Sequence, residues 1–375
     1  MLLIERKIDK MNEMMRDTYG NPSSLHNMGF DAEKELNNAR QIIAKSLKAN
    51  DKEIVFTSGG TESNNLALIG SALANRRAGK HIITSGIEHP SINEPLKFLE
   101  EEGYEVTYLP VDENGLVSLD ALRDSIRDDT ILVSIMHINN EIGSVQPLEE
   151  IGKIIKTKNP KCLFHTDATQ SYGKYAINPK SMKIDLLSAS GHKIHGPKGS
   201  GFIYIKNGTK IRPVIHGGGQ ERGLRSGTEN VYAQVGLGVA ALYMNDNMSD
   251  NVDTLRALKN HFVERVNTME FASINGKTDE LSASNIVSVS IKDVRAEVIL
   301  HSLEDRDIYV SAGSACSSNK PAVSKTLQAI GLPKEMLDKT VRFSFSIFNI
   351  EVFFLFIMNG RNFHKSFSIS IFPTK

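Results

Sequence analysis

The stretch that decides the fold is Ser188-Ala-Ser-Gly-His-Lys-Ile-His-Gly-Pro-Lys-Gly-Ser-Gly201, a turn rich in glycine and serine. The apolar runs on either side of it, Ile184 to Ala189 and Gly201 to Ile205, are typical of buried strands. Lys193 is therefore expected on a tight loop at a sheet edge, where small neighbours let another molecule come close. A partly desolvated lysine beside His192 would have a lowered pKa and act as an amine nucleophile toward a carbonyl.

Two other interpretations of this stretch compete. Gly191 and Gly196 have the spacing of a P-loop, but Pro197 stands where the lysine should be and Lys198 precedes glycine, so that motif is excluded. The second alternative is an ordinary solvated lysine in a turn, which is the common case for a lone lysine. The rest of the chain has to decide between a solvated and a reactive amine.

Composition sets outer bounds on the class of protein. The chain has 375 residues, 40% apolar and 23% charged, enough for two domains and a substantial core. Basic and acidic residues balance at 44 each, which gives no sign of nucleic acid or of an anionic membrane as a partner. The only cysteines, Cys162 and Cys316, cannot build a disulfide framework and suit a reducing, cytoplasmic compartment. We expect no signal peptide, because Met1 to Ile4 are followed at once by the charged residues Glu5, Arg6 and Lys7. We expect no membrane span, because the longest apolar run, Val352 to Met358, is far shorter than the roughly 20 residues that a span requires.

Strand and helix patterns alternate through the first two thirds of the chain. Strands are expected at 54–57, 81–84, 104–109, 130–136 and 161–166, and helices at 31–48, 66–74, 91–102, 118–127 and 147–157. Repeated units of this kind predict an α/β fold with a mainly parallel sheet and helices on both faces. Ligands of such sheets bind outside the carboxyl ends of the strands.

Polar residues collect at those carboxyl ends. His89 follows one strand, Asn140 the next but one, Asp167 another, and Ser190 and His192 the strand before Lys193. Each has a plain alternative: His89 before Pro90 and Asp167 are possible helix caps, and Asn140 a turn residue. Their joint position at one sheet edge is what these alternatives leave unexplained.

The loop after the first strand has the features of an anion site. Gly59, Gly60 and Thr61 stand between a strand and a helix start, where free N–H groups and the positive end of the helix dipole converge. No G-x-G-x-x-G follows a strand, which argues against a dinucleotide-binding fold. Pyridoxal phosphate (PLP) requires an anion cup, a carboxylate against its pyridinium nitrogen, a flat ring for stacking and a Schiff-base lysine. Gly60 with Thr61, Asp167, His89 and Lys193 would supply this set.

The last third of the chain predicts a smaller α+β domain. A glycine-rich polar loop, 216–228, precedes helices at 229–246 and 252–268, with a domain boundary near 245–253. A strand (285–291), a helix (295–304), a second helix (322–330) and a strand (339–344) carrying Arg342 follow. Cys162 opens an apolar strand and reads as a core thiol, whereas Cys316 lies in a Ser/Gly loop where a free thiol suggests a use. Arg342 would pair well with an amino-acid carboxylate.

Together these segments resemble the cysteine desulfurases (NifS/IscS-like) of the class-V aminotransferase family, which are fold-type-I PLP enzymes. The resemblance runs from Tyr19-Gly-Asn-Pro-Ser-Ser-Leu-His26 to about Ser344. The segments that carry it are Thr57-Ser-Gly-Gly-Thr-Glu-Ser-Asn-Asn65, His137-Ile-Asn-Asn-Glu-Ile-Gly143, His165-Thr-Asp-Ala-Thr-Gln170, Ser190-Gly-His-Lys193, Arg225-Ser-Gly-Thr228 and Gly313-Ser-Ala-Cys316.

The resemblance assigns a role to each residue. Lys193 would hold PLP covalently, His89 would stack on its ring, Asp167 would pair with the pyridinium, and Gln170 would contact the ring oxygen. The phosphate site would comprise Gly60, Thr61, Ser190 and His192, with Thr228 supplied by the other subunit of a homodimer. Asn140 and Arg342 would orient the carboxylate of L-cysteine. Cys316 would take the sulfur as a persulfide, or transiently hold an iron–sulfur cluster, and release alanine; no other metal site is expected. An acceptor scaffold protein would receive the sulfur for iron–sulfur clusters or thiolated tRNA.

Three domains follow: 1–248 binds PLP, 249–348 carries the cysteine loop, and 349–375 is an atypical tail. The family's N-terminal strand is missing, and nine of the sixteen phenylalanines fall in 343–375 with Glu351 as the only acid. This favours the hypothesis of an altered or truncated gene product with an aggregation-prone tail, whose fold survives while activity is weak or lost. The alternatives are therefore another class-V PLP enzyme, such as an aminotransferase or selenocysteine lyase, and a non-catalytic remnant.

Overall fold

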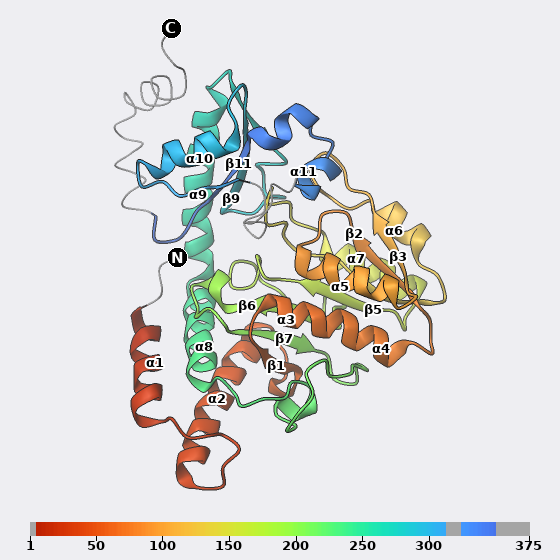
Figure 1. Ribbon diagram of the computed structural model, residues 1–375, viewed down its shortest axis with the longest axis vertical. Coiled ribbons are helices and arrows are strands. Elements are labelled where there is room, and N and C mark those ends of the chain that lie inside the picture. Colours follow the sequence, from red (N-terminus) through yellow and green to blue (C-terminus); the bar gives the residue numbers. More distant parts are fainter. Residues whose placement is uncertain (1–4, 313–323, 350–375) are drawn as a thin grey trace. The chain divides into compact units, whose positions relative to one another are not determined.

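The computed structural model describes residues 5–312 and 324–349, which divide into two compact units (Figure 1). The first unit comprises Met1–Leu109, Ser118–Ile138 and Gln146–Met248, and the second comprises Pro110–Val117, Asn139–Val145 and Ser249–Lys375. Cys316 and the tail from residue 350 lie outside the described residues. None of the helices within the described ranges combines the length and the apolar character that crossing a bilayer requires.

A seven-stranded sheet forms the centre of the first unit, in the order β1-β7-β6-β5-β4-β2-β3. Its strands are β1 (Ile54–Thr57), β2 (His81–Ser85), β3 (Glu105–Leu109), β4 (Thr130–Ser134), β5 (Leu163–Asp167), β6 (Leu186–Ser190) and β7 (Gly201–Ile205). Strands β3, β2, β4, β5 and β6 pair in parallel, and β7 runs antiparallel to both β6 and β1. The predicted α/β fold with a mainly parallel sheet is confirmed.

Most strands of this sheet are buried along their whole length because both faces are covered. Every residue of β1, β2, β4, β6 and β7 is buried, as expected for strands between two helix layers. Among these seven strands, only β3, which lies at one of the two edges of the sheet, contains solvent-exposed residues. A core cluster that includes Ile82, Leu132, Leu186 and Ile203 fills the space under the covering helices.

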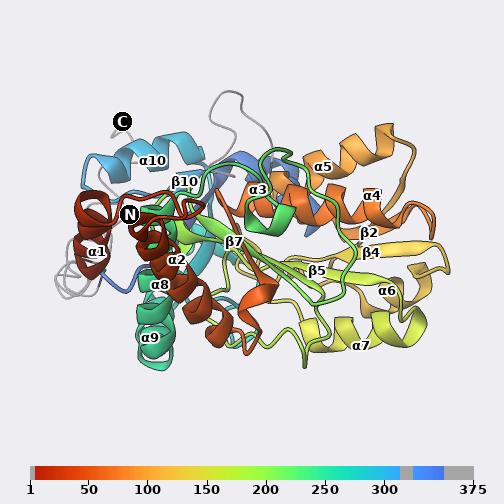
Figure 2. The same ribbon diagram turned by 90° about the horizontal axis from the view of Figure 1, so that it is seen from below.

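Helices cover both faces of this sheet (Figure 2). The helices α3 (Gly60–Asn65), α4 (Ser71–Asn75) and α5 (Pro90–Glu101) lie on one face, and α6 (Leu119–Ser125) and α7 (Leu148–Lys158) lie on the other. A π-helical turn at Leu66–Gly70 joins α3 to α4, so the helical run begins at Gly60, earlier than the predicted residue 66. The long helices α2 (Asn27–Ser46) and α8 (Val231–Asp246) pack against each other, and α1 (Glu5–Asp17) packs on α8.

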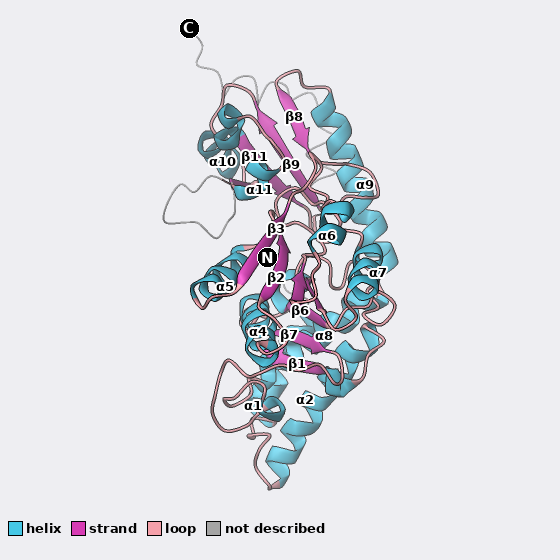
Figure 3. Cartoon of the chain, turned by 90° about the vertical axis from the view of Figure 1, so that its right-hand side faces the viewer, coloured by secondary structure: helices cyan, strands magenta, loops and turns pink. Residues whose placement is uncertain are grey.

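The second unit is built on a four-stranded antiparallel sheet in the order β10-β11-β9-β8. The strands are β8 (Ala272–Asn275), β9 (Ile286–Ile291), β10 (Ser311–Ala312) and β11 (Thr340–Ser344). Helices α9 (Met248–Asn267) and α10 (Ala296–Glu304) lie beside this sheet (Figure 3), and α11 (Lys325–Ala329) precedes its last strand. Phe262 of α9 packs on Phe343 of β11, with ring centroids 4.7 Å apart.

Two early segments belong to the second unit although the sequence assigned residues 1–248 to one domain. Residues 110–117 and 139–145 leave the large sheet and return to it. Hydrogen bonds explain the clustering of the second segment: Ala283 N donates to Gly143 O at 2.7 Å, and Val145 N donates to Leu281 O at 3.1 Å. A boundary drawn from linker composition cannot find an excursion of this kind, because the backbone partners lie more than a hundred residues away in the chain.

Candidate active site

The turn that carries Lys193 is compact enough to require glycine. β6 runs into a 3-10 turn at Gly191–Ile194, and Gly196 N closes the loop by donating to Gly191 O at 2.8 Å. A Cβ on Gly196 would stand 2.7 Å from that carbonyl oxygen, and one on Gly191 would stand 2.4 Å from the Ser200 hydroxyl. Lys193 is half-buried on this turn at the carboxyl end of β6, as the sequence predicted.

A second lysine, which the sequence analysis did not single out, is hydrogen-bonded to the backbone of this turn. Lys174 is buried, and its Nζ donates to Gln170 O at 3.1 Å and to Lys193 O at 3.2 Å. Burial, followed by the charge of Lys193, lowers the pKa of Lys174 to about 8. Lys174 therefore ties the backbone at Gln170 to the backbone of Lys193, and it adds positive charge beside the Lys193 amine.

Asp167 ends β5 and is fixed by two donors. Its Oδ2 accepts from Asn64 Nδ2 at 2.8 Å and its Oδ1 accepts from the backbone N–H of Thr169 at 2.9 Å. Asn64 comes from α3 and also donates to Ser91 Oγ at 2.9 Å. The carboxylate is thus held at the buried end of β5 by a side chain of α3 and by the turn that follows the strand.

His89 is both a helix cap and a ring beside this carboxylate. Its Nδ1 accepts the Ser91 N–H at 3.1 Å, which caps α5, and lies 2.8 Å from Ser91 Oγ. Burial lowers the pKa of His89, opposed by the charge of Asp167 and reinforced by that of Lys193, so the ring is neutral near pH 7. Ser91 Oγ, which contacts His89 Nδ1, also accepts from Asn64 Nδ2, and Asn64 Nδ2 donates to Asp167 as well, so a chain of hydrogen bonds connects the His89 ring to the Asp167 carboxylate.

A buried carboxyl precedes this histidine. Glu88 Oε1 accepts from Ser85 Oγ and, at 2.9 Å, from the backbone N–H of Met136. Burial, with a further contribution from the charge of Asp167, raises the pKa of Glu88 to about 8. The neutral carboxyl joins the end of β2 to the end of β4, and thereby fixes the loop from which His89 projects.

The residues predicted to form an anion cup lie where α3 begins. Gly59 has φ +151°, which favours glycine, and a Cβ on Gly60 would stand 2.9 Å from Thr169 Oγ1. Ser190 Oγ lies 2.8 Å from His192 Nδ1, and burial together with neighbouring lysine charges lowers the pKa of His192 to about 4. The buried hydroxyl of Thr169 has no hydrogen-bond partner among the described residues, which leaves a donor for a ligand beside Gly60. A phosphate group fits this set of N–H and hydroxyl donors.

The glycine-rich loop is anchored to the same unit by charge pairs. Glu221 receives both terminal nitrogens of Arg40 at 2.8 Å and the backbone N–H of Phe56 at 2.9 Å. Arg225 Nε donates to Glu62 Oε1 of α3 at 2.9 Å. Thr228, which follows these anchors, is exposed.

Asn140 and Arg342 meet within the second unit. Arg342 Nη1 donates to the backbone carbonyl of Asn140 at 2.7 Å, and its Nη2 donates to Ser311 Oγ at 3.0 Å. The neighbouring Asn139 stabilises the loop itself, since its Oδ1 accepts from the N–H groups of Glu141 and Ile142 at 2.8 and 3.0 Å. Both predicted carboxylate-binding residues are therefore positioned by one loop and one strand of the same unit.

Of the two cysteines, the structure describes Cys162, which is the core thiol that the sequence predicted. Cys162 is fully buried, and burial raises the pKa of its thiol to about 12, which makes it an inert core thiol. Cys316 belongs to residues 313–323, outside the described part of the chain, and its place relative to the other residues stays a prediction.

The residues of the first unit fit PLP. They offer an amine on a half-buried turn, a buried carboxylate, a neutral imidazole ring and glycine N–H groups beside a buried hydroxyl without a partner among the described residues, which is the set of groups that this cofactor needs. Comparison with known proteins agrees. A model of the aminotransferase class-V family matches residues 2–351.

The chain belongs to the class-V aminotransferase family.

Individual relatives narrow the comparison. The chain is 45% identical to the cysteine desulfurase IscS of Methanosarcina thermophila over 91% of its own length and 84% of that relative. A solved NifS-like protein is 36% identical with a TM-score of 0.91, covering 98% of this chain and 97% of that one. A structure described as SspA in complex with cysteine is also 36% identical, with a TM-score of 0.80 and coverage of 92% and 95%. Cysteine desulfurases of this family depend on PLP.

Proposed function

We propose that this chain is a PLP-dependent cysteine desulfurase, which converts L-cysteine to L-alanine and passes the sulfur to Cys316. The observation that carries the proposal is the position of Lys193 on the turn after β6, together with the hydrogen-bonded His89 and Asp167, in a chain 45% identical to a cysteine desulfurase. Lys174 holds the backbone of Lys193, and Ser91 and Asn64 hold the His89 ring and the Asp167 carboxylate, so this part of the site is in place before a substrate arrives.

Each of these residues has a proposed task. Bound PLP supplies an electron sink, which lets electron density from the substrate move into its ring. Asp167 keeps the ring nitrogen protonated and Gln170 contacts the ring oxygen. Neutral His89 covers the ring face and is available to move a proton. Lys193 would hold the cofactor covalently through its side-chain amine.

The phosphate site anchors the cofactor away from the reacting atoms. Gly60 and Thr61 donate backbone N–H groups, and Ser190 and His192 add side chains that already contact each other. Thr228 would complete the same site in the partner of a homodimer, which is consistent with its exposed position on an anchored loop. Arg342 and Asn140 would bind the substrate carboxylate, with the guanidinium as a fixed bidentate donor.

Sulfur transfer balances with Cys316 as the nucleophile. Its thiolate attacks the sulfur of bound cysteine, an S–S bond forms, and the C–S bond breaks with its electron pair going to the carbon side. Proton uptake by that carbon gives alanine, and Cys316 is left as a persulfide. A scaffold protein in the cytoplasm would accept this sulfur for iron–sulfur cluster assembly or tRNA thiolation.

The experiment that tests the function is a product assay on the PLP-loaded protein. L-cysteine with a thiol reductant should yield alanine and sulfide in equal amounts, and Cys316→Ala should lose both. Cys162→Ala is the matched control, since it removes the other thiol from the core and should keep both products. Equal product release by Cys316→Ala and the unaltered protein would contradict the proposed role of Cys316.

A further inference from the structure

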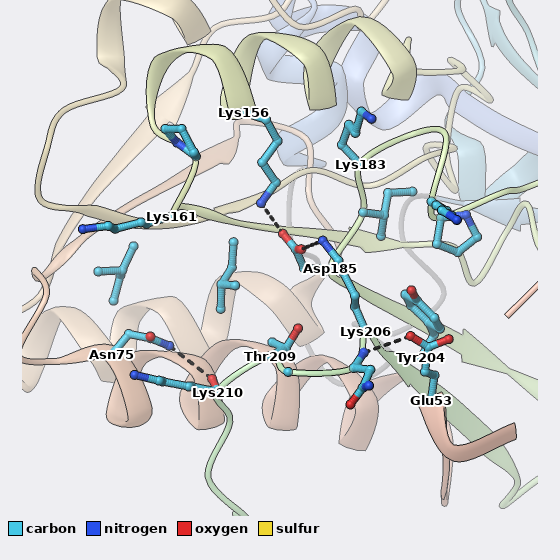
Figure 4. A pocket seen from close by; sticks show the side chains of 18 of the residues that line it. Glu53, Asn75, Lys156, Lys161, Lys183, Asp185, Tyr204, Lys206, Thr209 and Lys210 are labelled. Carbon is cyan, nitrogen blue, oxygen red and sulfur yellow. Dashed lines mark hydrogen bonds and ion pairs between the residues drawn. The ribbon is translucent and has the colours of Figure 1, made fainter. Parts of the chain in front are cut away.

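A groove opens at the amino-terminal ends of the parallel strands, and the candidate active site lies at their carboxyl ends (Figure 4). It lies where β4, β5 and β6 begin, whereas Asp167 and Ser190 lie where β5 and β6 end. The groove has a volume of about 1120 Å³, somewhat larger than the roughly 300–1,000 Å³ typical of small-molecule pockets. All of its lining residues belong to the first unit.

The groove is strongly basic in a chain whose overall net charge is zero. Three carboxylates line it, Glu53, Asp128 and Asp185. They stand against seven lysines, which are Lys48, Lys156, Lys161, Lys180, Lys183, Lys206 and Lys210. This local excess of positive charge gives the groove a field that attracts anions.

Most of this charge is not used within the described structure. Asp185 is shared by Lys156 and Lys206 and also accepts the Phe164 N–H at 2.9 Å. Glu53 accepts the N–H groups of Asn50 and Asn207, both at 2.9 Å. The other five lysines are exposed, and none of them forms an ion pair with a residue in the described ranges. Ion pairs with Asp185 therefore account for the charges of two lysines, and the other five ammonium groups face solvent.

The lining favours a protein partner over a nucleic acid. It contains no arginine, and its one aromatic residue, Tyr204, is 4% exposed, so it offers neither bidentate phosphate forks nor a stacking surface. The lining also includes Ala49, Pro160 and the half-buried Leu163, which provide apolar contacts. Point charges with small apolar patches suit a segment in which carboxylates alternate with aliphatic side chains.

We propose that this groove binds an extended, acidic segment of a partner protein. The carboxylates of that segment pair with the ammonium groups of Lys48, Lys161, Lys180, Lys183 and Lys210. Its aliphatic side chains contact the apolar lining residues Ala49, Pro160 and Leu163. The site is independent of catalysis, because it lies at the far edge of the sheet from Lys193 and shares no residue with the active site.

The test is a binding measurement on the PLP-loaded protein by fluorescence anisotropy. The probes are a labelled synthetic peptide of alternating glutamate and leucine, the same peptide with glutamine for glutamate, and a labelled oligouridylate of equal charge. The first should bind and the glutamine peptide should not. The triple variant Lys161→Glu/Lys183→Glu/Lys210→Glu should weaken acidic-peptide binding by about tenfold or more.

The matched control is Lys34→Glu/Lys153→Glu/Lys334→Glu, which makes the same charge change at three exposed lysines outside the groove. It should bind the acidic peptide within about twofold of the unaltered protein, and both triple variants should release alanine normally. Equal loss of binding in the two variants would overturn the proposal, since the effect would then be one of net charge. Absence of peptide binding, or tighter binding of the oligouridylate with the same dependence on the groove lysines, would also overturn it.

Discussion

Removing one partner from the buried ion pair between Arg40 and Glu221 should strongly destabilise the first unit. Both side chains are almost fully buried, with 8% and 2% exposed, and both Nη–Oε distances are 2.8 Å. Arg40 also donates to Ile54 O at 2.8 Å and stands over the Phe56 ring. Glu221→Gln leaves the guanidinium buried without a counter-charge and turns one acceptor into a donor.

The expected loss is about 3–5 kcal/mol, as for a buried pair that has lost one partner. For a unit of this size, that corresponds to a fall in melting temperature of roughly 10 °C. The assay is thermal unfolding of the PLP-loaded protein by circular dichroism, with cofactor absorption recorded in the same scan. Arg40→Met/Glu221→Met should lose less than the sum of its single variants, because it buries no lone charge.

A surface pair in the same unit provides the control. Arg127 binds Glu105 with the same two contacts of 2.8 Å, but their side chains are 41% and 63% exposed. Glu105→Gln should therefore cost less than about 1 kcal/mol. Equal shifts for Glu221→Gln and Glu105→Gln, or strictly additive losses in the double variant, would refute the argument that burial sets the strength of the Arg40 pair.

Three further predictions concern the active site. Lys193→Ala should lose the cofactor's absorption band and reduce alanine release on the order of 10³-fold or more, measured on protein dialysed against PLP. Asp167→Asn should keep the band but reduce the turnover number by on the order of 10²-fold, and unchanged turnover would remove the proposed role of the carboxylate. Glu88 has a folded pKa of about 8 against an ordinary value of 4.5, so the unfolded chain releases this proton first and native stability falls as pH rises between these values. Glu88→Gln should remove that fall. The melting temperature of the variant relative to that of the unaltered protein should therefore rise between pH 5 and pH 8, and a difference that does not change with pH would contradict the raised pKa.

The sequence was most informative where local pattern and burial coincide. Strand β1 was predicted at its observed bounds because four consecutive apolar or β-branched residues precede a glycine turn. The residues at the carboxyl ends of β5 and β6 were found because the polarity changes abruptly after each buried strand. The turn at Lys193 could be predicted because glycines between two apolar runs are typical of a tight turn between strands.

Contacts between distant segments were beyond the reach of sequence patterns. Asn64 and Asp167 are 103 residues apart, and only the fold shows that one holds the other. Lys174 looks like an ordinary lysine in the sequence, and its burial depends on the path of the loop after β5. The short strands β8 and β10 were missed, since β8 mixes polar and apolar residues and β10 pairs over only two positions.

The central claim is that sulfur from cysteine is transferred to Cys316, and the most direct measurement is the mass of the cysteine-containing peptides after reaction without reductant. PLP-loaded protein is mixed with L-cysteine, quenched with an alkylating agent and digested. The account predicts one added sulfur atom on the peptide that contains Cys316, in step with the alanine formed, and none on the peptide that contains Cys162. Formation of alanine with no sulfur on Cys316 at any time would contradict it.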